Sequence, residues 1–454
     1  MSKLFEEFSP VTAKEWKQKI HVDLKGADYN ETLITHTAEG IDIKPFYHSD
    51  DATPIQVPTR ATQTGSWYIS QSIYAGDAAV ANEKAKDGLS RGAEGVLFII
   101  PNNSIDIEVL FKDLPNIGIQ VHPQFLDLAF LEKLQQAQPK CYVHLDIINQ
   151  LASDGNWFEN LKPDHEKWLA FLLQHPGYFS NITVNTSLYQ EAGASVVQEL
   201  AYYMAHLNEY LNHLEQYDMI SAFAKAEKRI NIDTAIGSDY FMNIAKYRAY
   251  RLVTKSLGKA YGLELEAYIT ASPSLRNKSL LDYNVNMLRT TTECMSAVLG
   301  GCDTIYNLPY DAFFNKENEF GTRIARNQLL VLKDEAYFDK IHNAADGAYF
   351  IEDLTKQLAE KANDLFKEIE KAGGFVQALF DGTVQRKLKE SDAKEREALE
   401  TGQRVLVGVN KYPNKDQGMQ EEYELYPYVK TKPRKTLIAP IVPKRLAEDF
   451  EKQA

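Results

Sequence analysis

Few side chains in this sequence have the type and spacing that catalysis requires. His122, His144 and His175 fall at or near β-rich runs, and none has a serine, cysteine or carboxylate beside it in the pattern of a nucleophile–base pair. Asp146 lies near the end of one such run, at the strand end where barrel enzymes place their chemistry, but it has no second carboxylate beside it in the sequence. We therefore expect these four residues to be structural.

The three cysteines, Cys141, Cys294 and Cys302, lack the spacing of a metal or redox site. No C-x-x-C pair occurs, and no histidine is arranged with them as a ligand. The segment from Met1 to Phe8 has no apolar signal region, and no run approaches the roughly 18 to 20 apolar residues that span a bilayer. We expect reduced thiols, no metal and an unexported, cytoplasmic protein.

The composition limits the classes of partner. The chain has 454 residues, 44% of them hydrophobic, which is enough for one large domain with smaller attachments. Lys and Arg total 50 against 63 Asp and Glu, so the net charge is -13. This acidic excess is spread along the chain and argues against nucleic acid or an anionic membrane as a partner.

A short β-rich run followed by a helical run recurs from about Ser66 to Asn307. Each β-rich run is too short for a helix, and the intervals are long enough for crossover helices. The eight expected strands are Trp67–Ser70, Gly95–Ile100, Gly118–His122, Cys141–Ile147, Ile182–Asn185, Ile230–Ala235, Glu266–Ala271 and Asp303–Asn307. Eight such units predict an α/β fold, a parallel (β/α)8 TIM barrel.

Two of the intervening helices are predicted with defined ends. One spans Asp239–Lys255 with Asp239 as its N-terminal cap, and another spans Asn284–Leu299 and stops at the glycine pair that follows. The apolar face expected for the first helix consists of Phe241, Ile244, Ala245, Ala249 and Leu252.

The barrel is expected to occupy residues 61–380, with an attachment on either side. Residues 1–60 are predicted to form an N-terminal arm with a helix around Thr12–Lys19. Residues 381–454 are predicted to form a C-terminal helix, strand and linker tail.

The C-terminal attachment is predicted in more detail. Helical runs cover Asp353–Lys371 and Val384–Glu400, and the charges of the second suit a solvated face. Arg404–Tyr412 reads as a strand with turn residues, and the polar, proline-punctuated segment Pro413–Ala454 reads as an extended wrapping segment.

Several segments resemble the substrate-binding barrel of the methylmalonyl-CoA mutase family. Those that carry the resemblance are Gln190–Ala194 (QEAGA), Asn243–Ala249 (NIAKYRA), Ala297–Gly301 (AVLGG), Arg323–Gln328 (RIARNQ), Ala345–Glu352 (ADGAYFIE), Glu39–Tyr47 and Gly408–Tyr412. They extend over nearly the whole chain, but none is a catalytic motif. The resemblance therefore indicates the family strongly and the activity weakly.

The resemblance implies a radical rearrangement of an acyl-CoA that depends on adenosylcobalamin. In that family the cobalt is held by a histidine in a D-x-H-x-x-G motif, and no such motif occurs in these 454 residues. Asp164-His165, and Asp339 with His342, have the wrong spacing. We expect no cobalamin-binding domain and no cofactor bound by this chain.

Positions that are catalytic in active family members are substituted here. A Tyr-His pair before the QEAGA segment, whose histidine donates a hydrogen bond to the substrate carbonyl, corresponds to Ser187 and Leu188. A tyrosine that contacts the adenosyl group corresponds to Ser72, with Tyr74 as a shifted alternative, and a glutamine after the double glycine corresponds to Asp303. Because leucine donates no hydrogen bond, we expect the chain itself to be inactive.

Two further positions are candidates for substrate binding. Arg229 matches an arginine that contacts CoA in active members, and its neighbour Asn231 stands where they have a serine. Whether the barrel still takes an acyl-CoA stays open, because a retained arginine can equally pair with a carboxylate.

The resemblance implies the small, non-catalytic subunit of a heterodimeric mutase. Its partner would be a homologous catalytic large subunit that carries adenosylcobalamin. One alternative is an active acyl-CoA mutase barrel served by a separate cobalamin-binding subunit, although such a chain should keep Tyr and His at positions 187 and 188. Another is a CoA-ester-binding or hydrolytic barrel unrelated to mutases, for which no nucleophile–base pair is evident.

Overall fold

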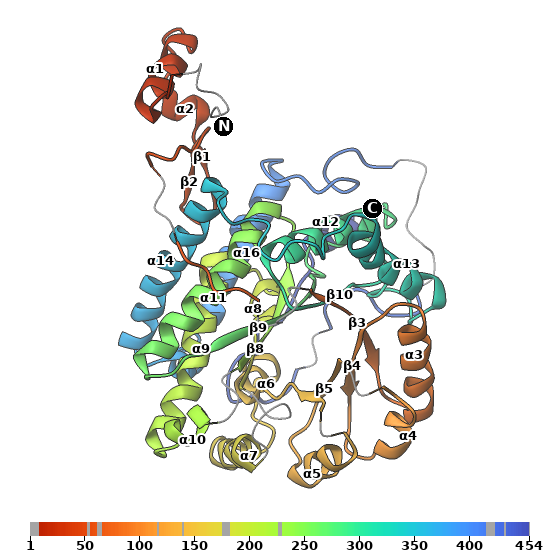
Figure 1. Ribbon diagram of the computed structural model, residues 1–454. Coiled ribbons are helices and arrows are strands. Elements are labelled where there is room, and N and C mark those ends of the chain that lie inside the picture. The colour runs from red at the N-terminus through yellow and green to blue at the C-terminus, as the bar shows by residue number, and fades with distance from the viewer. Residues whose placement is uncertain are drawn as a thin grey trace, which may run out of the picture.

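Eight parallel strands, β3 to β10, curl into a barrel surrounded by helices (Figure 1). The computed structural model describes residues 9–51, 55–60, 66–115, 118–138, 140–174, 182–225, 229–414, 423–430 and 433–453. The strand order is β6-β5-β4-β3-β10-β9-β8-β7, and every pairing between neighbours is parallel. The predicted (β/α)8 barrel is therefore confirmed.

The observed strands lie where the β-rich runs predicted them. Their bounds are β3 Tyr68–Tyr74, β4 Gly95–Ile100, β5 Ile119–Pro123, β6 Tyr142–Val143, β7 Ile182–Asn185, β8 Arg229–Ile236, β9 Glu266–Pro273 and β10 Thr304–Tyr306. Most residues of these strands are buried, because barrel strands face helices on one side and the packed interior on the other.

Helices cover the outside of the barrel. Those between or beside the strands are α3 Ala78–Ser90, α4 Ile107–Phe111, α5 Leu128–Ala137, α6 Ile147–Asp154, α7 Leu161–Gln174, α8 Ser187–Glu191, α9 Val196–Gln216, α10 Ile220–Lys225, α11 Tyr240–Ala260, α12 Val285–Gly300 and α13 Glu319–Leu330, which continues into the π-helix η1 Val331–Glu335. No described helix is both long and apolar enough to cross a membrane.

The ends of two helices agree with the sequence patterns. The Asp239 carboxylate accepts a hydrogen bond from Met242 N at the start of α11, and Gly301 ends α12 in a left-handed conformation with φ of 89°. The single apolar face predicted for α11 is wrong, because the helix packs against α9, α12 and α14 and is buried almost all around from Met242 to Arg251. Phe241, placed on that face, is exposed.

The strand predicted at Cys141–Ile147 is shorter than expected. Asp146 caps the N-terminus of α6 by accepting a hydrogen bond from Asn149 N, so the chain turns into a helix at Ile147. Within the described residues, β6 and β7 form the two ends of the hydrogen-bonded sheet and do not pair with each other. We call this gap in the backbone ladder the seam.

The N-terminal arm consists of α1 Ala13–Asp23, α2 Tyr29–Leu33 and a hairpin of β1 Thr35–His36 and β2 Asp42–Ile43. The hairpin is anchored to the barrel because the Glu39 carboxylate at its tip accepts hydrogen bonds from the N-terminal amides of α9, Val196 N and Val197 N, at 2.7 and 2.8 Å. Figure 1 shows α1 and α2 above the barrel body, and α1 has no buried residue.

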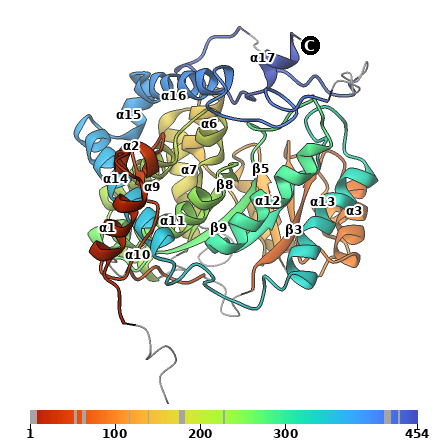
Figure 2. The same ribbon diagram turned by 90° about the horizontal axis from the view of Figure 1, so that it is seen from above.

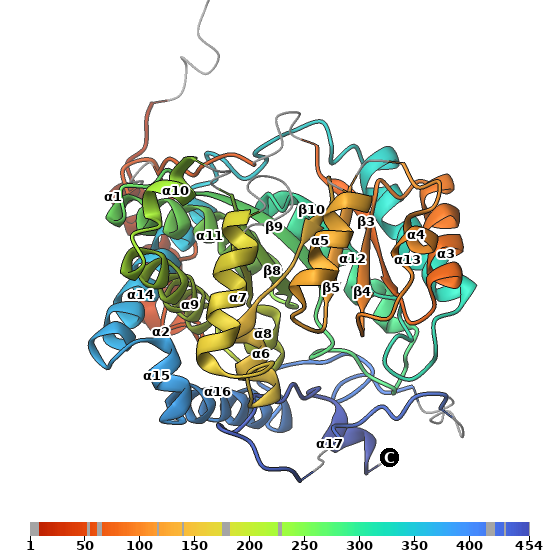
Figure 3. The ribbon, with the colours of Figure 1, turned by 90° about the horizontal axis from the view of Figure 1, so that it is seen from below.

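The C-terminal part contains α14 Tyr349–Lys371, α15 Phe375–Phe380, α16 Thr383–Glu400 and the short α17 Glu448–Glu451. The strand predicted at Arg404–Tyr412 is wrong: a turn folds back there, with a single bridge between Val407 and Lys411. Figures 2 and 3 show α16, the tail beyond it and α17 lying along one end of the barrel.

Candidate functional site

The side chains that could do chemistry lie inside the barrel on alternating strand positions. On β8, Arg229, Asn231 and Asp233 share one face and Ile230 and Ile232 share the other. The polar face points to the barrel interior, since Asp233 and Arg229 contact residues on or next to β6 across the seam. The barrel therefore has a polar interior instead of a purely aliphatic one.

A histidine–carboxylate pair lies at the carboxyl half of this interior. His144 Nδ1 lies 2.8 Å from Asp233 Oδ2, and the imidazole is 3% exposed. Burial lowers the pKa of the neighbouring His122, while the charge of Asp233 opposes that shift. Burial also raises the pKa of Tyr306, which faces the same carboxylate, to about 12. The expectation that His144 has no carboxylate partner is thus wrong.

The pair does not extend to a nucleophile. Among the described residues, neither ring nitrogen of His144 is hydrogen-bonded to a serine, threonine or cysteine. Burial raises the pKa of the thiols of Cys141, Cys294 and Cys302, which keeps them protonated and unreactive. The arrangement lacks the nucleophile of a triad.

Asp146 also has partners that the sequence did not reveal. Its carboxylate accepts hydrogen bonds from Asn185 N on β7, from His206 Nε2 and from the Tyr210 hydroxyl on α9, at 2.8 to 3.0 Å, in addition to that from Asn149 N. Burial alone would raise the pKa of Asp146, but His206 and these donors lower it. The carboxylate is therefore a structural junction that joins β6 to β7 across the seam.

We expect Asp146→Asn to lower the free energy of unfolding by about 2 to 3 kcal/mol. Both carboxylate oxygens of Asp146 accept hydrogen bonds, and the NH2 group of asparagine, which can only donate, must replace one of them. Since the folded-state pKa is lowered, the carboxylate stabilises the fold above the ordinary aspartate pKa of about 4 and loses this effect as the pH falls through the lowered value. Urea unfolding should show a constant difference in the free energy of unfolding between the wild type and Asp146→Asn from pH 7 to about 4. Below about pH 4 this difference should become smaller.

The matched control for this measurement is Asp77→Asn. Asp77 caps α3 from an exposed position by accepting from Val80 N, and asparagine caps equally well. Equal losses of unfolding free energy in the two variants would contradict the role of Asp146 as a structural junction.

Arg229 lies at the amino end of β8 between two tyrosines. Its Nη1 donates to the Tyr142 hydroxyl at 2.7 Å, and its guanidinium carbon lies 5.4 and 4.9 Å from the ring centroids of Tyr142 and Tyr268. Asn231, the second predicted substrate-binding residue, is fully buried, and its two amide atoms have no hydrogen-bond partner among the described residues. Arg229 is therefore already engaged, whereas Asn231 keeps its hydrogen-bonding capacity.

Other interior atoms resemble Asn231 in having no described partner. They are Ser70 Oγ, Gln120 Oε1, Thr183 Oγ1 and Thr270 Oγ1. Buried polar atoms of this kind normally bond to water or a polar ligand. They give the barrel interior a polar lining.

The four substituted family positions lie on or beside three different elements. Ser72 lies on β3, and Ser187 and Leu188 begin α8, where Leu188 is 8% exposed within the main hydrophobic cluster. Asp303 precedes β10, where its Oδ2 accepts from Arg251 Nη2 and Ile269 N, both at 2.8 Å. Asp303 thus forms a buried ion pair with α11.

Tyr74, the shifted alternative to Ser72, ends β3 with its side chain exposed. The pairing of β3 with β4 runs without a break from Ser70–Gly95 to Tyr74–Ile99, so no bulge moves Tyr74 into the place of Ser72.

Asp164-His165, one of the two pairs with the wrong spacing for the cobalt-binding motif, lies within the described residues. No group of three or more His, Cys, Asp or Glu there could hold a metal. His165 Nδ1 is bonded to Leu161 O within α7, and the buried Asp164 accepts from Phe158 N and Glu159 N. These side chains do not fit cobalamin. His175 lies outside the described residues.

The loops after the barrel strands are covered by the chain's own tail (Figures 2 and 3). Ile438 N donates to Gly155 O after α6, Lys444 N to Glu191 O after α8, and Leu446 N to Arg276 O after β9. The tail therefore crosses the end of the barrel at which parallel α/β proteins place their active sites.

Fold and interior together define a (β/α)8 barrel protein with a polar core. The family model for methylmalonyl-CoA mutase matches residues 124–445. The chain belongs to the methylmalonyl-CoA mutase family.

Three relatives agree with this placement. The methylmalonyl-CoA mutase small subunit of Porphyromonas gingivalis is 33% identical over 91% of this chain and 71% of the relative. The methylmalonyl-CoA mutase of Rhizobium meliloti is 28% identical over 88% of this chain and 64% of the relative. The methylmalonyl-CoA mutase small subunit of Streptomyces virginiae is 28% identical over 90% of this chain and 72% of the relative. The match to small subunits agrees with the sequence-based expectation.

Proposed function

We propose that this chain is the supporting subunit of a heterodimeric methylmalonyl-CoA mutase. A homologous large subunit would hold adenosylcobalamin and interconvert methylmalonyl-CoA and succinyl-CoA. The observation that carries this proposal is the state of the barrel interior, where Arg229 is held between Tyr142 and Tyr268 while Leu188 is packed into the core. Leu188 has no group that could donate to a substrate carbonyl, and Arg229 already donates to the Tyr142 hydroxyl.

The N-terminal arm supports a role in pairing. Its helix α1 presents Trp16 at 50% exposure together with Val22, and it buries none of its own residues. Val11, just before the helix, is also exposed. Apolar side chains on a projecting arm gain stability by packing against another surface. We expect an interface of obligate size, above about 2,000 Å² in total, that includes this arm.

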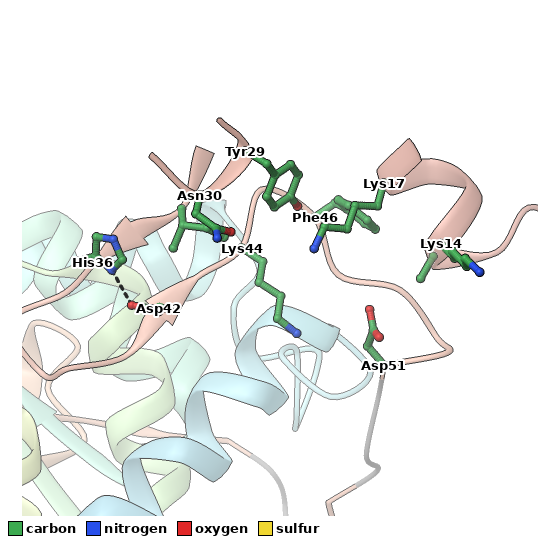
Figure 4. Close-up of a pocket in the computed structure, with 11 residues that line it drawn as sticks. Lys14, Lys17, Tyr29, Asn30, His36, Asp42, Lys44, Phe46 and Asp51 are labelled. Atoms are coloured by element: carbon green, nitrogen blue, oxygen red, sulfur yellow. Dashed lines mark hydrogen bonds and ion pairs between the residues drawn. The ribbon is translucent and has the colours of Figure 1, made fainter. Parts of the chain in front are cut away.

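A hollow of about 600 Å³ in the arm adds to this argument (Figure 4). It lies between α1, α2 and the hairpin, and Lys44 and Asp51 line it. Tyr29 forms part of its wall under the ammonium of Lys17, 4.6 Å from the ring centroid. A cavity with polar and aromatic walls on a projecting arm suits a side chain from the partner subunit.

Mixing this chain with the large subunit tests the proposal. Alone, with adenosylcobalamin and methylmalonyl-CoA, the chain should give no turnover, and Leu188→His should not create any, because Ser72, Ser187 and Asp303 remain. Deleting residues 1–51 should weaken association with the large subunit at least tenfold by light scattering. Turnover by the chain alone, or a large subunit equally stable and active without it, would refute the proposal.

A matched pair of point variants separates the arm from general surface effects. Trp16→Ala on α1 should weaken association, whereas Phe380→Ala on α15 removes an aromatic ring of similar exposure, 45%, and should not. If the two variants weaken association equally, the arm is not part of the interface.

A further inference from the structure

A groove of about 930 Å³ runs along the outer surface of the barrel between α4 and α5. It borders α5 over its whole length, from Asp127 at the N-terminal cap to Ala137 at the last residue, and α4 from Asp106 to Phe111. Figure 1 shows these two helices at the end of the molecule away from the arm. The groove therefore lies apart from the surface proposed for the large subunit.

The groove exists because α4 is short. This helix spans five residues, whereas α3 before it spans 13 and α5 after it spans 10. Asp113 adopts a left-handed conformation with φ of 57°, and Pro115, which has no amide hydrogen to donate, follows two residues later. The helical layer that surrounds a (β/α)8 barrel is thus incomplete beside α5, and a further helix is the element that would complete it.

One face of α5 is turned to this groove and is open to solvent. Ala129, Lys133, Gln136 and Ala137 follow the i, i+4, i+7, i+8 spacing of a single helix face, and all four are exposed. The two alanines allow another backbone to approach α5 closely at either end of this face. Ile105, half-buried in the loop before α4, adds an accessible apolar side chain to the opposite wall. The walls therefore suit the packing of a helix.

The rim of the groove carries an excess of negative charge. Asp106, Glu108 and Asp127 are acidic, and Lys133 is the one basic residue among the described residues that line it. Asp106 and Glu108 are both exposed. A hydrogen bond from Asn103, together with those from the first amides of α5, lowers the pKa of Asp127 and keeps its carboxylate charged. Three negative charges against one positive favour a cationic occupant.

We propose that the α4–α5 groove is a docking surface for a basic amphipathic helix of a partner protein. The short α4 leaves the place of a helix in the outer layer, and the acidic rim favours a basic polar face on the helix that fills it. A helix of about 10 to 14 residues matches the length of α5. Its apolar side packs on Ile105, Ala129 and Ala137, and its basic side chains meet Asp106 and Glu108. This proposal does not rest on pairing with the large subunit, which involves the arm at the other end of the molecule.

Binding of a model peptide to the full chain tests this surface. The probe is a fluorescein-labelled amphipathic helix of about 14 leucine and lysine residues, compared with a peptide in which glutamate replaces every lysine. Fluorescence anisotropy should show saturable binding of the lysine peptide and binding at least about tenfold weaker for the glutamate peptide. Hydrogen exchange should show that the lysine peptide protects the segment from Asn103 to Ala137 and no other part of the barrel.

Surface substitutions in the groove should weaken this binding without disturbing the fold. Asp106→Asn keeps the N-terminal cap of α4, and Glu108→Gln changes an exposed side chain. Together they should weaken binding of the lysine peptide at least about fivefold. Ala137→Lys adds a positive charge to the exposed face of α5 and should also weaken it.

The control is the pair Glu397→Gln and Glu400→Gln, which removes the same charge from exposed positions of α16 and should leave binding unchanged. Equal weakening by the two pairs, equal binding of the two peptides, or no binding of the lysine peptide by the wild type would overturn the proposal. Protection from exchange at a site other than α4 and α5 would overturn it as well.

Discussion

Replacing Glu199 with glutamine is expected to lower the free energy of unfolding by about 3 to 5 kcal/mol. Glu199 on α9 is fully buried, and its Oε1 accepts from the hydroxyls of Thr186, Thr234 and Tyr250 at 2.9 to 3.0 Å. Its Oε2 lies 3.1 Å from the ammonium of Lys246, which is itself 1% exposed. Glutamine keeps the shape but leaves this ammonium as an uncompensated buried charge.

A double variant distinguishes the charge from the packing. Lys246→Met removes the ammonium, and combining it with Glu199→Gln should recover part of the stability lost by Glu199→Gln alone. Asp23→Asn is the control, because its pair with Lys19 on α1 is exposed and should be worth less than about 1 kcal/mol. Chemical denaturation of the wild type and these variants gives the comparison, and a loss of unfolding free energy below about 1 kcal/mol in Glu199→Gln would contradict the prediction.

Replacing Glu451 with glutamine is expected to cost about 3 kcal/mol and to release the C-terminal tail. Arg445 donates to both carboxylate oxygens of Glu451, at 2.6 and 2.7 Å, and the two side chains are 6% and 0% exposed. Glu451 Oε1 also accepts from Leu280 N, and Arg445 Nη1 donates to Lys278 O, both in the loop between β9 and α12. One ion pair therefore fastens the tail to that loop.

Limited trypsin digestion measures this release, since Arg434, Lys444 and Arg445 lie in the tail. The Glu451→Gln protein should be cut there faster than the wild type and should melt at a lower temperature. Asp449→Asn, on the same short helix, breaks pairs with Arg396 and Lys444 around a carboxylate that is 42% exposed, and should have little effect. If both variants are cut at the same rate, the Arg445–Glu451 pair does not fasten the tail.

The sequence was sufficient to predict the barrel because its pattern is local. Each strand is a short β-branched run, and each helix carries signals in its own residues, such as Asp239 before α11 and Gly301 after α12. Where local patterns failed, the cause was also local: Asp146 ends β6 early by capping α6, and the run Arg404–Tyr412 folds into a turn. The resemblance to the mutase family depended on such segments and is confirmed by the family match.

The partners of the polar side chains came only from the tertiary structure. Asp233 stands between Ile232 and Thr234 in the sequence, and its pair with His144 joins residues 89 positions apart. Asp303 looked like a lost catalytic glutamine, yet it pairs with Arg251 at the amino end of β10. The alternation of Arg229, Asn231 and Asp233 with isoleucines was the one signal in the sequence that could have indicated a polar face on this strand.

Arg326 is another residue whose surroundings only the tertiary structure reveals. In the sequence it is one residue of a helical family motif, and only the tertiary structure shows that it is buried and that its Nη1 donates to Gln71 Oε1 on β3. Periodicity determines which face of a strand or helix is buried, because that depends on backbone geometry alone. Which charges end up without water, and which residues compensate them, depends on contacts between elements distant in the chain.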